Sequence, residues 1–404
     1  MSCINKLEIK VGNLGKNISI DLNGKNLMVT GRNGSGKTSF LNEIEGVLKD
    51  KLIHKKNDSL EELESYLHLQ EDRLSSFSIV DSMHSIVVKN ISETKKDIEK
   101  LNRHNIEFFN FTQLFSDFTD GRAVFKFFEA SRRVDINIPS GAPPLSKFKD
   151  LDDLSTSSYF EEYLVSYKTR QAYANQIGDK ELSEIINSWF LKLENDLCEL
   201  FEEKLSLEFN YDTMRFSLVN NSGRSFSFQE LPSGYSAIMA IYSELITRVR
   251  FKEVPPDEIG GVVIIDEIDA HLHVSLQKKI FAFLDSSFPN VQFIVSTHSP
   301  FVLSSVSNSV IYDLSTEEVV DDLSLYSYDA ILDGLFNVNV SSKILEEKTN
   351  NIINLMNNPT NTTELERCVR ELIPLETQID ESSQVILGKA KLLLAKLKRG
   401  ALDV

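Results

Sequence analysis

The feature that most constrains this chain is the octapeptide GRNGSGKT, which occupies residues 31–38. It follows the short apolar run Asn26–Thr30 and precedes Ser39–Leu48, whose pattern favours a helix. A glycine-rich turn between a buried strand and a helix presents successive backbone N–H groups and the positive end of the helix dipole to an anion. The sequence therefore predicts an α/β fold built around a phosphate-binding loop.

Each part of this loop has an expected role in holding the phosphates of a nucleotide. Gly34 and Gly36 lack the Cβ that would block the close approach of a phosphate. The ammonium of Lys37 reaches the β- and γ-phosphates, and the Thr38 hydroxyl is a ligand for Mg²⁺. The loop residues that we expect at the nucleotide are Asn33, Gly34, Ser35, Gly36, Lys37, Thr38 and Ser39. An ordinary glycine-rich turn is the alternative, and the strand and helix that flank the loop disfavour it.

A second motif places two acids at the end of an apolar run. VVIIDEIDAHLH occupies residues 262–273, and four consecutive apolar residues are typical of a parallel strand buried on both faces. Asp266 would then lie at the carboxyl end of the strand, where ligands bind in such sheets, and would hold Mg²⁺ directly or through water. Glu267 is placed to orient or deprotonate the attacking water. A solvated strand end is the alternative for two acids taken alone.

A third apolar run, VQFIVS, starts at Val291 and leads directly into Thr297, His298 and Ser299. The imidazole of His298 would lie beside the two acids and could hydrogen-bond the γ-phosphate. A purely structural histidine is the alternative. The candidate catalytic residues are therefore Lys37, Glu267 and His298, and the candidate metal ligands from these motifs are Thr38 and Asp266.

The rest of the sequence predicts three parts. Residues 1–50 and 205–335 form a head that is split by an insertion of strands and a helical lobe at residues 51–204. Residues 336–404 form a C-terminal helical region. Amphipathic helices mainly bury one face, so this last region is either a capping lobe or a docking surface for a nuclease or a second copy.

Local patterns predict the elements inside and just after the insertion. Val80–Lys89 favours a strand, and the phenylalanine-rich stretch 108–128 favours a strand of the core. Tyr159–Lys204 has apolar residues at helical spacing, which predicts an amphipathic helical lobe. Leu205–Leu218 alternates in the way that a β-hairpin does.

Composition excludes several classes of protein. Lys and Arg total 43 and Asp and Glu total 60, so the formal charge is −17 and bulk attraction to nucleic acid is not expected. No run of 18 apolar residues occurs, and the first residues lack the apolar stretch of a signal peptide, so we expect a cytoplasmic protein that does not contact the membrane. The three cysteines are far apart, which favours reduced thiols.

The order of GRNGSGKT, LPSGYSAIMAIYSEL, VVIIDEIDAHLH and STHSP resembles the core of ABC-type ATPases, in the soluble branch that includes Rad50, SMC, RecF and the OLD nucleases. The resemblance covers residues 1–50 and about 225–310, with a weaker similarity at Phe125–Arg133. It implies a P-loop NTPase head with a mixed sheet that binds ATP and Mg²⁺. The run from DEIDAHLHVSLQKKI to FPNVQFIVSTHSPFVLSS is further similar to the PtuA-type ATPases of Septu and retron antiphage systems.

This resemblance assigns a role to the segment LPSGY. Ser233 and Gly234 would open a signature helix and contact the γ-phosphate bound to the opposite copy. The family's commoner form has a second glycine and a Gln or Glu, whereas this chain has Pro232 before the serine and Tyr235 after the glycine. Asp269 matches the family's carboxylate that couples the two nucleotide sites of a dimer.

The family also has a glutamine that contacts the nucleotide and its metal ion. Gln113, which follows a phenylalanine-rich segment, is our candidate for this role. Gln171 and Gln176, in the helical lobe, are alternatives.

The resemblance implies an ATPase that forms a homodimer or a higher even oligomer around ATP and regulates an HNH-type nuclease in antiviral defence. A retron reverse transcriptase with its RNA or DNA is a further implied partner. The chain shows no nuclease motif of its own, so a partner would cut DNA. The alternatives are a RecF- or Rad50-like DNA repair ATPase, which sustained heptads would favour, and an ATP-binding scaffold without turnover, which Glu267 disfavours.

Overall fold

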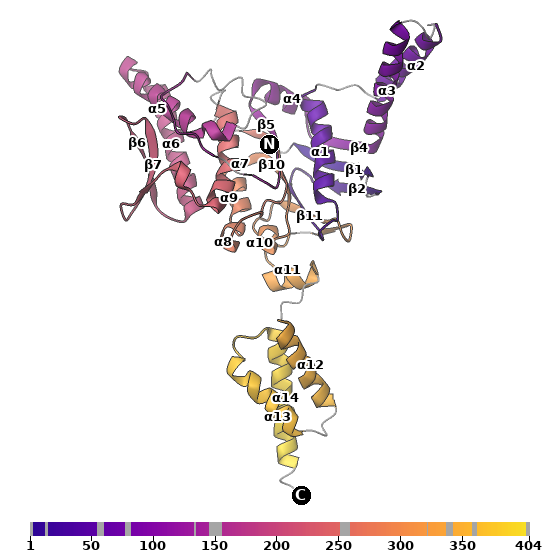
Figure 1. The fold of residues 1–404 in the computed structure, drawn as a ribbon, viewed down its shortest axis with the longest axis vertical. Coiled ribbons are helices and arrows are strands. Elements are labelled where there is room, and N and C mark those ends of the chain that lie inside the picture. Colours follow the sequence, from indigo (N-terminus) through magenta and orange to yellow (C-terminus); the bar gives the residue numbers. More distant parts are fainter. Residues whose placement is uncertain are drawn as a thin grey trace. The chain divides into compact units, whose positions relative to one another are not determined.

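A computed structural model describes residues 3–12, 15–54, 60–76, 82–132, 135–144, 156–250, 259–320, 322–336, 342–357 and 362–400. Its helices and strands are labelled in Figure 1. The chain separates into two compact units, Met1–Leu325 and Tyr326–Val404. The border between the units lies before the predicted one at residue 336, because the short helix α11 (Tyr328–Gly334) belongs to the second unit.

The first unit is organised by a six-stranded sheet with the strand order β12-β11-β3-β10-β9-β5. All neighbouring strands pair in parallel except β12, which is antiparallel to β11. The strands are β3 (Asn26–Thr30), β5 (Ala123–Phe128), β9 (Gly260–Ile265), β10 (Asn290–Ser296), β11 (Ser309–Asp313) and β12 (Glu318–Val320). Every residue of β3 and β9 is buried, which explains the apolar runs Leu27–Val29 and Val262–Ile265 within them. The strands predicted to begin at residues 26, 260 and 291 are confirmed, and their carboxyl ends meet at one edge of the sheet.

A second, antiparallel sheet has the order β2-β1-β4 and consists of β1 (Ile4–Val11), β2 (Lys16–Asp21) and β4 (His104–Phe108). Helix α1 (Lys37–Leu52) follows β3 and packs on both sheets. Its residues Phe40, Leu41 and Ile44 are fully buried in the same cluster as residues of β1, β3, β9 and β10. One core cluster of this unit therefore surrounds helix α1 and contains side chains of both sheets.

The predicted strand at Val80–Lys89 is wrong for the described part of that range, which begins helix α3 (Ser82–Arg103). Val87, Ile91 and Thr94 are buried and lie four and three residues apart, so they form one stripe along the helix. Packing of this stripe outweighs the β-propensity of the local sequence. Helix α2 (Leu60–Ser76) packs against α3.

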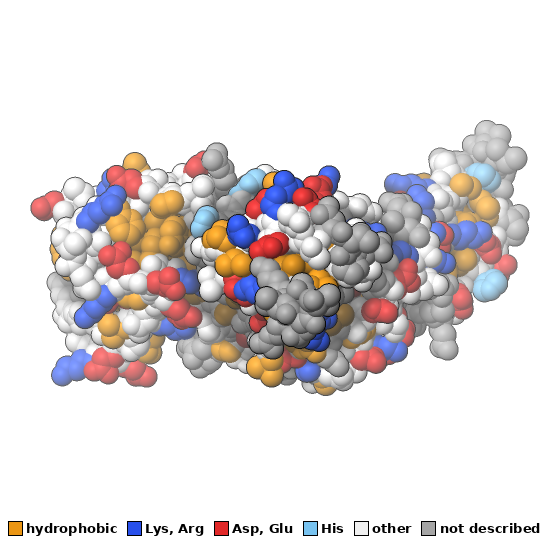
Figure 2. Space-filling view, turned by 90° about the horizontal axis from the view of Figure 1, so that it is seen from below, with side chains coloured by type: hydrophobic (Ala, Val, Ile, Leu, Met, Phe, Trp, Pro, Cys, Tyr) orange, Lys and Arg blue, Asp and Glu red, His pale blue; other side chains and the backbone are white. Residues whose placement is uncertain are grey.

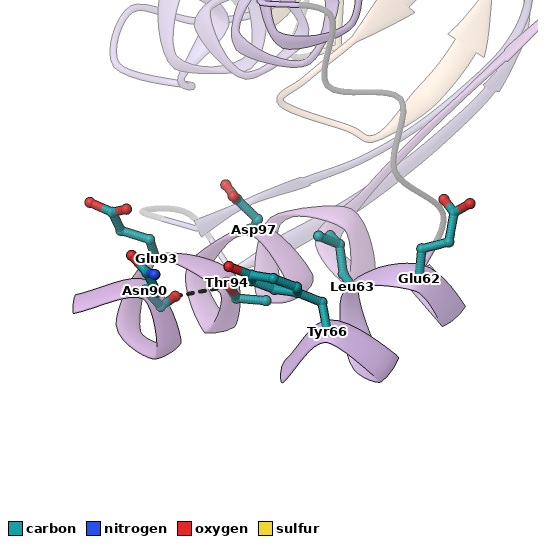
Figure 3. Close-up of a pocket in the computed structure, with 7 residues that line it drawn as sticks. All are labelled: Glu62, Leu63, Tyr66, Asn90, Glu93, Thr94 and Asp97. Carbon is teal, nitrogen blue, oxygen red and sulfur yellow. Dashed lines mark hydrogen bonds between the residues drawn. The ribbon is translucent and has the colours of Figure 1, made fainter. Parts of the chain in front are cut away.

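A cavity of about 350 Å³ lies in the α2–α3 hairpin, where Tyr66 of α2 lies beside Thr94 of α3 (Figure 3). The hydroxyl of Thr94 donates to the carbonyl oxygen of Asn90 at 2.8 Å. Figure 1 shows this hairpin projecting at the upper right of the first unit, whereas α8 (Val274–Gln277) and α10 (Pro300–Leu303) lie at its lower centre. The cavity is therefore separate from the edge where the buried strands end.

The phenylalanine-rich stretch is not one strand but the end of β4, a helix and β5. Helix α4 (Phe111–Asp120) begins where the Asn110 side chain accepts a hydrogen bond from a backbone N–H, and it ends at Gly121, which has a φ of 71°. Strands β4 and β5 pair with β1 and β9 of the two core sheets. Both strands thus belong to the head, although they fall within the predicted insertion 51–204.

The helical lobe consists of α5 (Phe160–Ile177) and α6 (Lys180–Phe201), as predicted. The predicted hairpin also forms, as β6 (Leu205–Asn210) and β7 (Arg215–Asn220), which pair antiparallel. Helix α7 (Ser233–Arg250) follows and makes a buried contact with the lobe.

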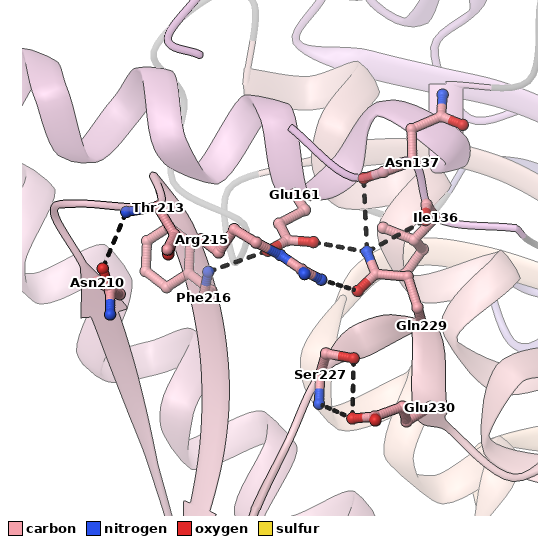
Figure 4. A network of polar contacts seen from close by, with 10 residues as sticks. All are labelled: Ile136, Asn137, Glu161, Asn210, Thr213, Arg215, Phe216, Ser227, Gln229 and Glu230. Carbon is pink, nitrogen blue, oxygen red and sulfur yellow. Dashed lines mark hydrogen bonds and ion pairs between the residues drawn. The ribbon is translucent and has the colours of Figure 1, made fainter. Parts of the chain in front are cut away.

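A polar network around Glu161 of α5 joins the lobe to the segment before α7 (Figure 4). This fully buried carboxylate accepts hydrogen bonds from the backbone N–H of Phe216 at 2.9 Å and from the side-chain amide of Gln229 at 2.6 Å. The amide of Gln229 also donates to the carbonyl oxygen of Ile136 at 3.2 Å. The network therefore connects the lobe, the hairpin, and the stretch that follows β5.

The second unit contains the predicted C-terminal helices. Besides α11 these are α12 (Lys343–Asn357), α13 (Thr362–Leu372) and α14 (Glu381–Gly400). They enclose a small core of their own around Ile352, Leu365 and Leu387, which are fully buried. In the part of the chain that the structure describes, no helix combines the length and the apolar character that crossing a membrane requires.

Candidate nucleotide-binding site

The loop between β3 and α1 has the backbone conformation that its glycines permit. Gly31, Gly34 and Gly36 have φ angles of 136°, 79° and 95°, which residues with a Cβ rarely adopt. Gly36 is the N-cap of α1, no side chain caps this helix end, and its first turn contains no acidic residue. The start of α1 therefore has the form that favours a bound anion, with no capping side chain and no acid in its first turn.

Lys37 lies within the curve of this loop. Its ammonium donates to the carbonyl oxygens of Gly31 at 3.2 Å and Arg32 at 3.4 Å, and only 6% of the residue is exposed. Burial lowers the pKa of Lys37, and the nearby carboxylates of Glu267 and Asp266 oppose that shift. The lysine and the two acids predicted from separate motifs are thus close enough to interact.

The turn after β11 holds the beginning of the loop. The hydroxyl of Ser315 accepts a hydrogen bond from the backbone N–H of Arg32 at 2.7 Å, and the Ser315 N–H donates to the carboxylate of Asp313 at 2.6 Å. A Cβ on Gly31 would lie 2.8 Å from the Ser35 hydroxyl and 3.0 Å from the Ser315 hydroxyl. Sequence reasoning missed Asp313 and Ser315, because only the pairing of β11 with β3 brings these two residues to the loop.

Asp266 lies at the centre of a row of hydroxyl contacts. Its carboxylate accepts hydrogen bonds from Thr38 at 2.8 Å and from Ser296 at 2.5 Å, and it is 4% exposed. Thr38 is the second residue of α1, and Asp266 directly follows β9. A hydroxyl and a carboxylate oxygen that converge in this way fit Mg²⁺, which prefers oxygen ligands. Ser296 is a residue that the motifs did not single out.

The backbone of Glu267 is held in an unusual conformation. Its φ is 45°, in the left-handed region, and its N–H donates to the hydroxyl of Ser296 at 2.7 Å. Two residues further, the Asp269 carboxylate accepts a hydrogen bond from the Thr297 hydroxyl at 2.6 Å. The turn after β9 is therefore fastened to the end of β10 by two side-chain hydroxyls.

His298 follows β10 and is partly buried beside the same groups. Burial lowers its pKa, the positive charge of Lys37 lowers it further, and the carboxylates of Asp269, Glu267 and Asp266 oppose the shift. Since the pKa moves down from 6.5, the imidazole is neutral near pH 7 and has one donor and one acceptor nitrogen. The loop, both acids, Asp269 and His298 thus meet at one edge of the sheet.

Arg132 is a further residue at this edge that sequence reasoning missed. It lies four residues beyond the end of β5, and its guanidinium donates to the carbonyl oxygens of Asp266 at 2.7 Å and Glu267 at 2.8 Å. The only sequence signal was the weak family similarity at Phe125–Arg133, whose last residue lies outside the described residues.

Ser233 is exposed and is the first residue of helix α7. The next residue, Gly234, packs closely on the segment after the acids, because a Cβ there would lie 2.8 Å from a methyl carbon of Leu276. The ring of Tyr235 stacks on Phe201 of α6 with centroids 4.4 Å apart. The departures from the family's usual signature thus connect this helix end to the lobe.

Figure 2 shows the molecule from below. Hydrophobic side chains gather on its left, over the part of the molecule formed by α6 and the β6–β7 hairpin.

Gln113 lies outside this site, contrary to our expectation. Its side-chain amide donates to both carboxylate oxygens of Asp117 at 3.0 Å, within helix α4. Two residues earlier, the Phe111 ring lies 5.6 Å from the ammonium of Lys51 in the last turn of α1. The loop precedes the first turn of α1, so a helix rise of 1.5 Å per residue separates these two ends by roughly 20 Å.

The alternative glutamines are in the lobe. The side-chain amide of Gln171 in α5 donates to the carbonyl oxygen of Ser183, and its own carbonyl oxygen accepts a hydrogen bond from Lys168 at 2.9 Å. Gln176 is exposed near the end of the same helix. A glutamine does not occupy the position after β5, where Arg132 lies instead.

Solved structures that the chain matches include an Smc head bound to the C-terminal winged-helix domain of ScpA, with 17% identity and a TM-score of 0.36. It covers 78% of this chain and 96% of that one. A nucleotide-free ATP-binding cassette of an ABC transporter has 13% identity and a TM-score of 0.33, and the match covers 79% of this chain and 90% of that one.

Curated relatives come from two kinds of system. A protein named "Retron Ec83 probable ATPase" from Escherichia coli is 29% identical over 41% of this chain and 33% of its own length. A "Septu protein PtuA" from Bacillus thuringiensis is 24% identical over 78% of this chain and 76% of its own length. The chain spans about a third or less of the first relatives that it matches. The predicted resemblance to retron and Septu ATPases is confirmed by these matches.

The family match covers the whole site. Residues 27–304 match the family described as "AAA domain, putative AbiEii toxin, Type IV TA system". This range includes the phosphate loop, the acids after β9 and His298, and it is more than half of the chain. The predicted class, an α/β fold of the P-loop ATPase type, is confirmed by this match together with the parallel sheet. The chain therefore belongs to this AAA-domain family.

Proposed function

We propose that this chain binds ATP with Mg²⁺ and hydrolyses it, and that two copies close around the nucleotide. The hydrogen-bonded row of Thr38, Asp266 and Ser296 carries this proposal, together with the Glu267 backbone held by the same serine. A phosphate loop alone supports anion binding. A hydroxyl and a carboxylate in contact at the start of α1 add the ligand pair that a magnesium–nucleotide site needs.

The phosphates of ATP would lie against the loop and the first turn of α1. The backbone N–H groups of Asn33–Lys37 and the helix dipole favour negative charge there, with Ser39 in the first turn of the helix. The Lys37 ammonium exchanges its contacts with the loop carbonyls for the β- and γ-phosphates. Thr38 and Asp266 would hold Mg²⁺, which would supply neutralisation of the charge on the phosphate oxygens.

Hydrolysis needs a group that aligns and deprotonates water. Glu267 directly follows the metal-ligand candidate Asp266, and its backbone is fixed by Ser296, so its carboxylate is the candidate base. The neutral imidazole of His298 is a candidate donor to the γ-phosphate, and its reduced pKa keeps that role available at neutral pH.

Closure of two copies would complete the site. Ser233 is exposed at the start of an 18-residue helix, so its hydroxyl and the helix N–H groups are accessible to a nucleotide held by another copy. Asp269 lies in the turn that also contains Glu267 and is tied to Thr297, so movement at a dimer interface reaches the candidate base directly. A homodimer or a higher even oligomer satisfies this arrangement.

The names of the relatives support a role in antiviral defence. They include ATPases of retron systems and PtuA proteins of Septu systems. We place this chain in the same kind of assembly, in which it regulates an HNH-type nuclease and, in a retron setting, acts with a reverse transcriptase and its RNA or DNA. The nucleotide state would shift the population between assemblies. Helices α2 and α3 have 17 and 22 residues, or roughly 25–33 Å, which disfavours the long arms of a Rad50-like repair ATPase.

Phosphate release by the purified full chain tests the proposed hydrolysis. Glu267→Gln should retain ATP binding and lose steady phosphate release by about a hundredfold or more, because the base is removed and the metal ligands remain. Lys37→Ala should lose ATP binding itself. Glu318→Gln, on the exposed edge strand β12, is the matched control and should behave as the unmodified chain. Equal phosphate release from Glu267→Gln and the unmodified chain would overturn the catalytic assignment.

A further inference from the structure

The Arg132 guanidinium is committed to the backbone of the turn after β9. One terminal nitrogen donates to the carbonyl oxygens of Asp266 at 2.7 Å and Glu129 at 2.9 Å, and the other donates to the carbonyl oxygen of Glu267 at 2.8 Å. Two consecutive carbonyl groups are thus held by the two terminal nitrogens of one planar group. Only the fork geometry of arginine provides this, because a lysine ammonium is a single point donor.

The turn needs such support because of the conformation of Glu267. A residue with a Cβ at a φ of 45° is in the left-handed region, which is less favourable than ordinary helical or extended backbone. Its N–H is held from one side by the Ser296 hydroxyl, and its carbonyl oxygen is held from the other side by Arg132. The direction of the Glu267 side chain therefore depends on both contacts.

The surroundings of Arg132 show why this contact is strong. The guanidinium is largely removed from water, and burial lowers its pKa to about 10, so it remains charged at pH 7. The carboxylates of Asp269, Asp266 and Glu267 favour its charged form. A charged donor to a neutral carbonyl in a poorly solvated place forms a stronger hydrogen bond than a neutral donor.

We propose that Arg132 is a positioning residue for hydrolysis: it holds the backbone of Asp266 and Glu267 so that the Glu267 carboxylate points at the attacking water. This inference rests on the proposed role of Glu267 as the base. Arg132 makes its contacts to the turn through backbone carbonyl groups, so it acts through Glu267 and not on the nucleotide itself.

A positioning role predicts a specific split between kinetic constants. Arg132→Ala should lower kcat about tenfold to a hundredfold, while the Kd for ATP changes less than about threefold, because the phosphate loop does not involve Arg132. Arg132→Lys keeps the positive charge and loses the fork, so it should recover less than half of the lost kcat on a logarithmic scale.

Arg122 provides a matched control. It lies directly before β5, whereas Arg132 lies after β5. Its guanidinium pairs with Asp117 and Asp120 and is half exposed. Arg122→Ala should leave both kcat and the Kd for ATP unchanged. A melting temperature for each variant shows whether it folds, and Arg132→Lys remains available should Arg132→Ala not fold.

Hydrogen exchange separates this inference from the proposed function, because it needs no turnover. Without nucleotide, the amides of Ile268 and Ala270, which bond within and across this turn, should exchange at least about fivefold faster in Arg132→Ala than in Arg122→Ala. Faster exchange in a chain that hydrolyses no ATP would contradict the proposed function, and it would show only that Arg132 holds the turn after β9. Unchanged exchange together with unchanged kcat, in an active enzyme, would overturn the positioning role. A fall in ATP affinity equal to the fall in activity would overturn it too, since it would indicate a contact to nucleotide.

Discussion

At the scale of single residues, the site is defined by which hydroxyl groups and acids meet at the ends of three strands. The Ser296 hydroxyl is shared, because it donates to the Asp266 carboxylate and accepts from the Glu267 N–H. It thereby couples a candidate metal ligand to the backbone of the candidate base. Thr38 contributes the second hydroxyl to the same carboxylate.

Ser296→Ala should lower kcat for ATP hydrolysis about tenfold, because it removes both hydrogen bonds and leaves the Glu267 N–H unpaired. The affinity for ATP should change little, because the phosphate loop is intact. Steady-state phosphate release and equilibrium nucleotide binding measure the two quantities. Ser305→Ala removes a hydroxyl that donates to the carbonyl oxygen of Val302 and is the control. Full activity of Ser296→Ala would show that the shared serine has no part in aligning the turn.

The loop and both acids are predictable from sequence because each motif is short and its chemistry is local. Ser296 and Arg132 are not, because their roles arise only when β10 and β5 pair on either side of β9. The expectation for Gln113 fails for the same reason. The strand order of the sheet makes β5 the second neighbour of β9, and the segment that follows β5 contains Arg132 and not Gln113. A residue's distance along the chain from the site carries no information about that order.

At the scale of elements, strand β5 connects the lobe side of the molecule to the site. It pairs in parallel with β9 and brings Arg132 to the acids. The close approach depends on Gly261, whose φ is 128°. A Cβ there would lie 2.0 Å from the carbonyl oxygen of Val124. Residues 82–89 show the opposite case, where a β-like sequence becomes a helix because its buried stripe packs against neighbours.

Gly261→Ala should destabilise the first unit by roughly 3 kcal/mol or more, because the new Cβ overlaps backbone that cannot move without separating β5 from β9. Urea unfolding followed by tryptophan fluorescence measures this, since Trp189 is the only tryptophan and lies in the first unit. Gly388→Ala makes the same chemical change in helix α14, where nothing lies within 4 Å of the added carbon. It should stabilise its helix by roughly 0.5–1 kcal/mol and leave the Trp189 transition unchanged. A Gly261→Ala chain as stable as the unmodified one would exclude this close strand approach.

Helices α6 and α7 are joined by a buried acid, and this contact should depend on pH. The Asp196 carboxylate accepts a hydrogen bond from the Tyr242 hydroxyl at 2.7 Å. Burial raises the pKa of Asp196 above 3.8, so the folded chain binds this proton more readily than the unfolded chain does. The contribution of this group to stability is therefore present below pH 3.8 and is lost as the pH rises through the folded-state pKa.

Asp196→Asn removes that titration and keeps an oxygen that accepts from Tyr242. Its free energy of unfolding, relative to that of the unmodified chain, should therefore rise as the pH increases from 4 to 7. Urea denaturation across this range gives the difference directly. A difference that is constant or falls with pH would show that the carboxylate is not disfavoured by burial.

At the scale of the whole molecule, the proposed ATP hydrolysis requires two copies that share each nucleotide. The phosphate loop, the acids and His298 lie together in one copy, whereas Ser233 is exposed at the start of α7. The C-terminal unit has its own core. Sequence patterns predict its helices, because each has an apolar stripe, but they do not identify what those helices bind.

Complementation between two defective copies tests the shared site most directly. A copy with Lys37→Ala retains Ser233, and a copy with Ser233→Arg retains Lys37. The two chains are expressed together with different tags, and the mixed assembly is purified on both tags. Each mixed dimer then has one intact site out of two, so it should release phosphate at about half the rate of the unmodified dimer, whereas each variant alone is inactive. A mixed assembly as inactive as its parents, although it forms, would contradict a nucleotide site built from two copies.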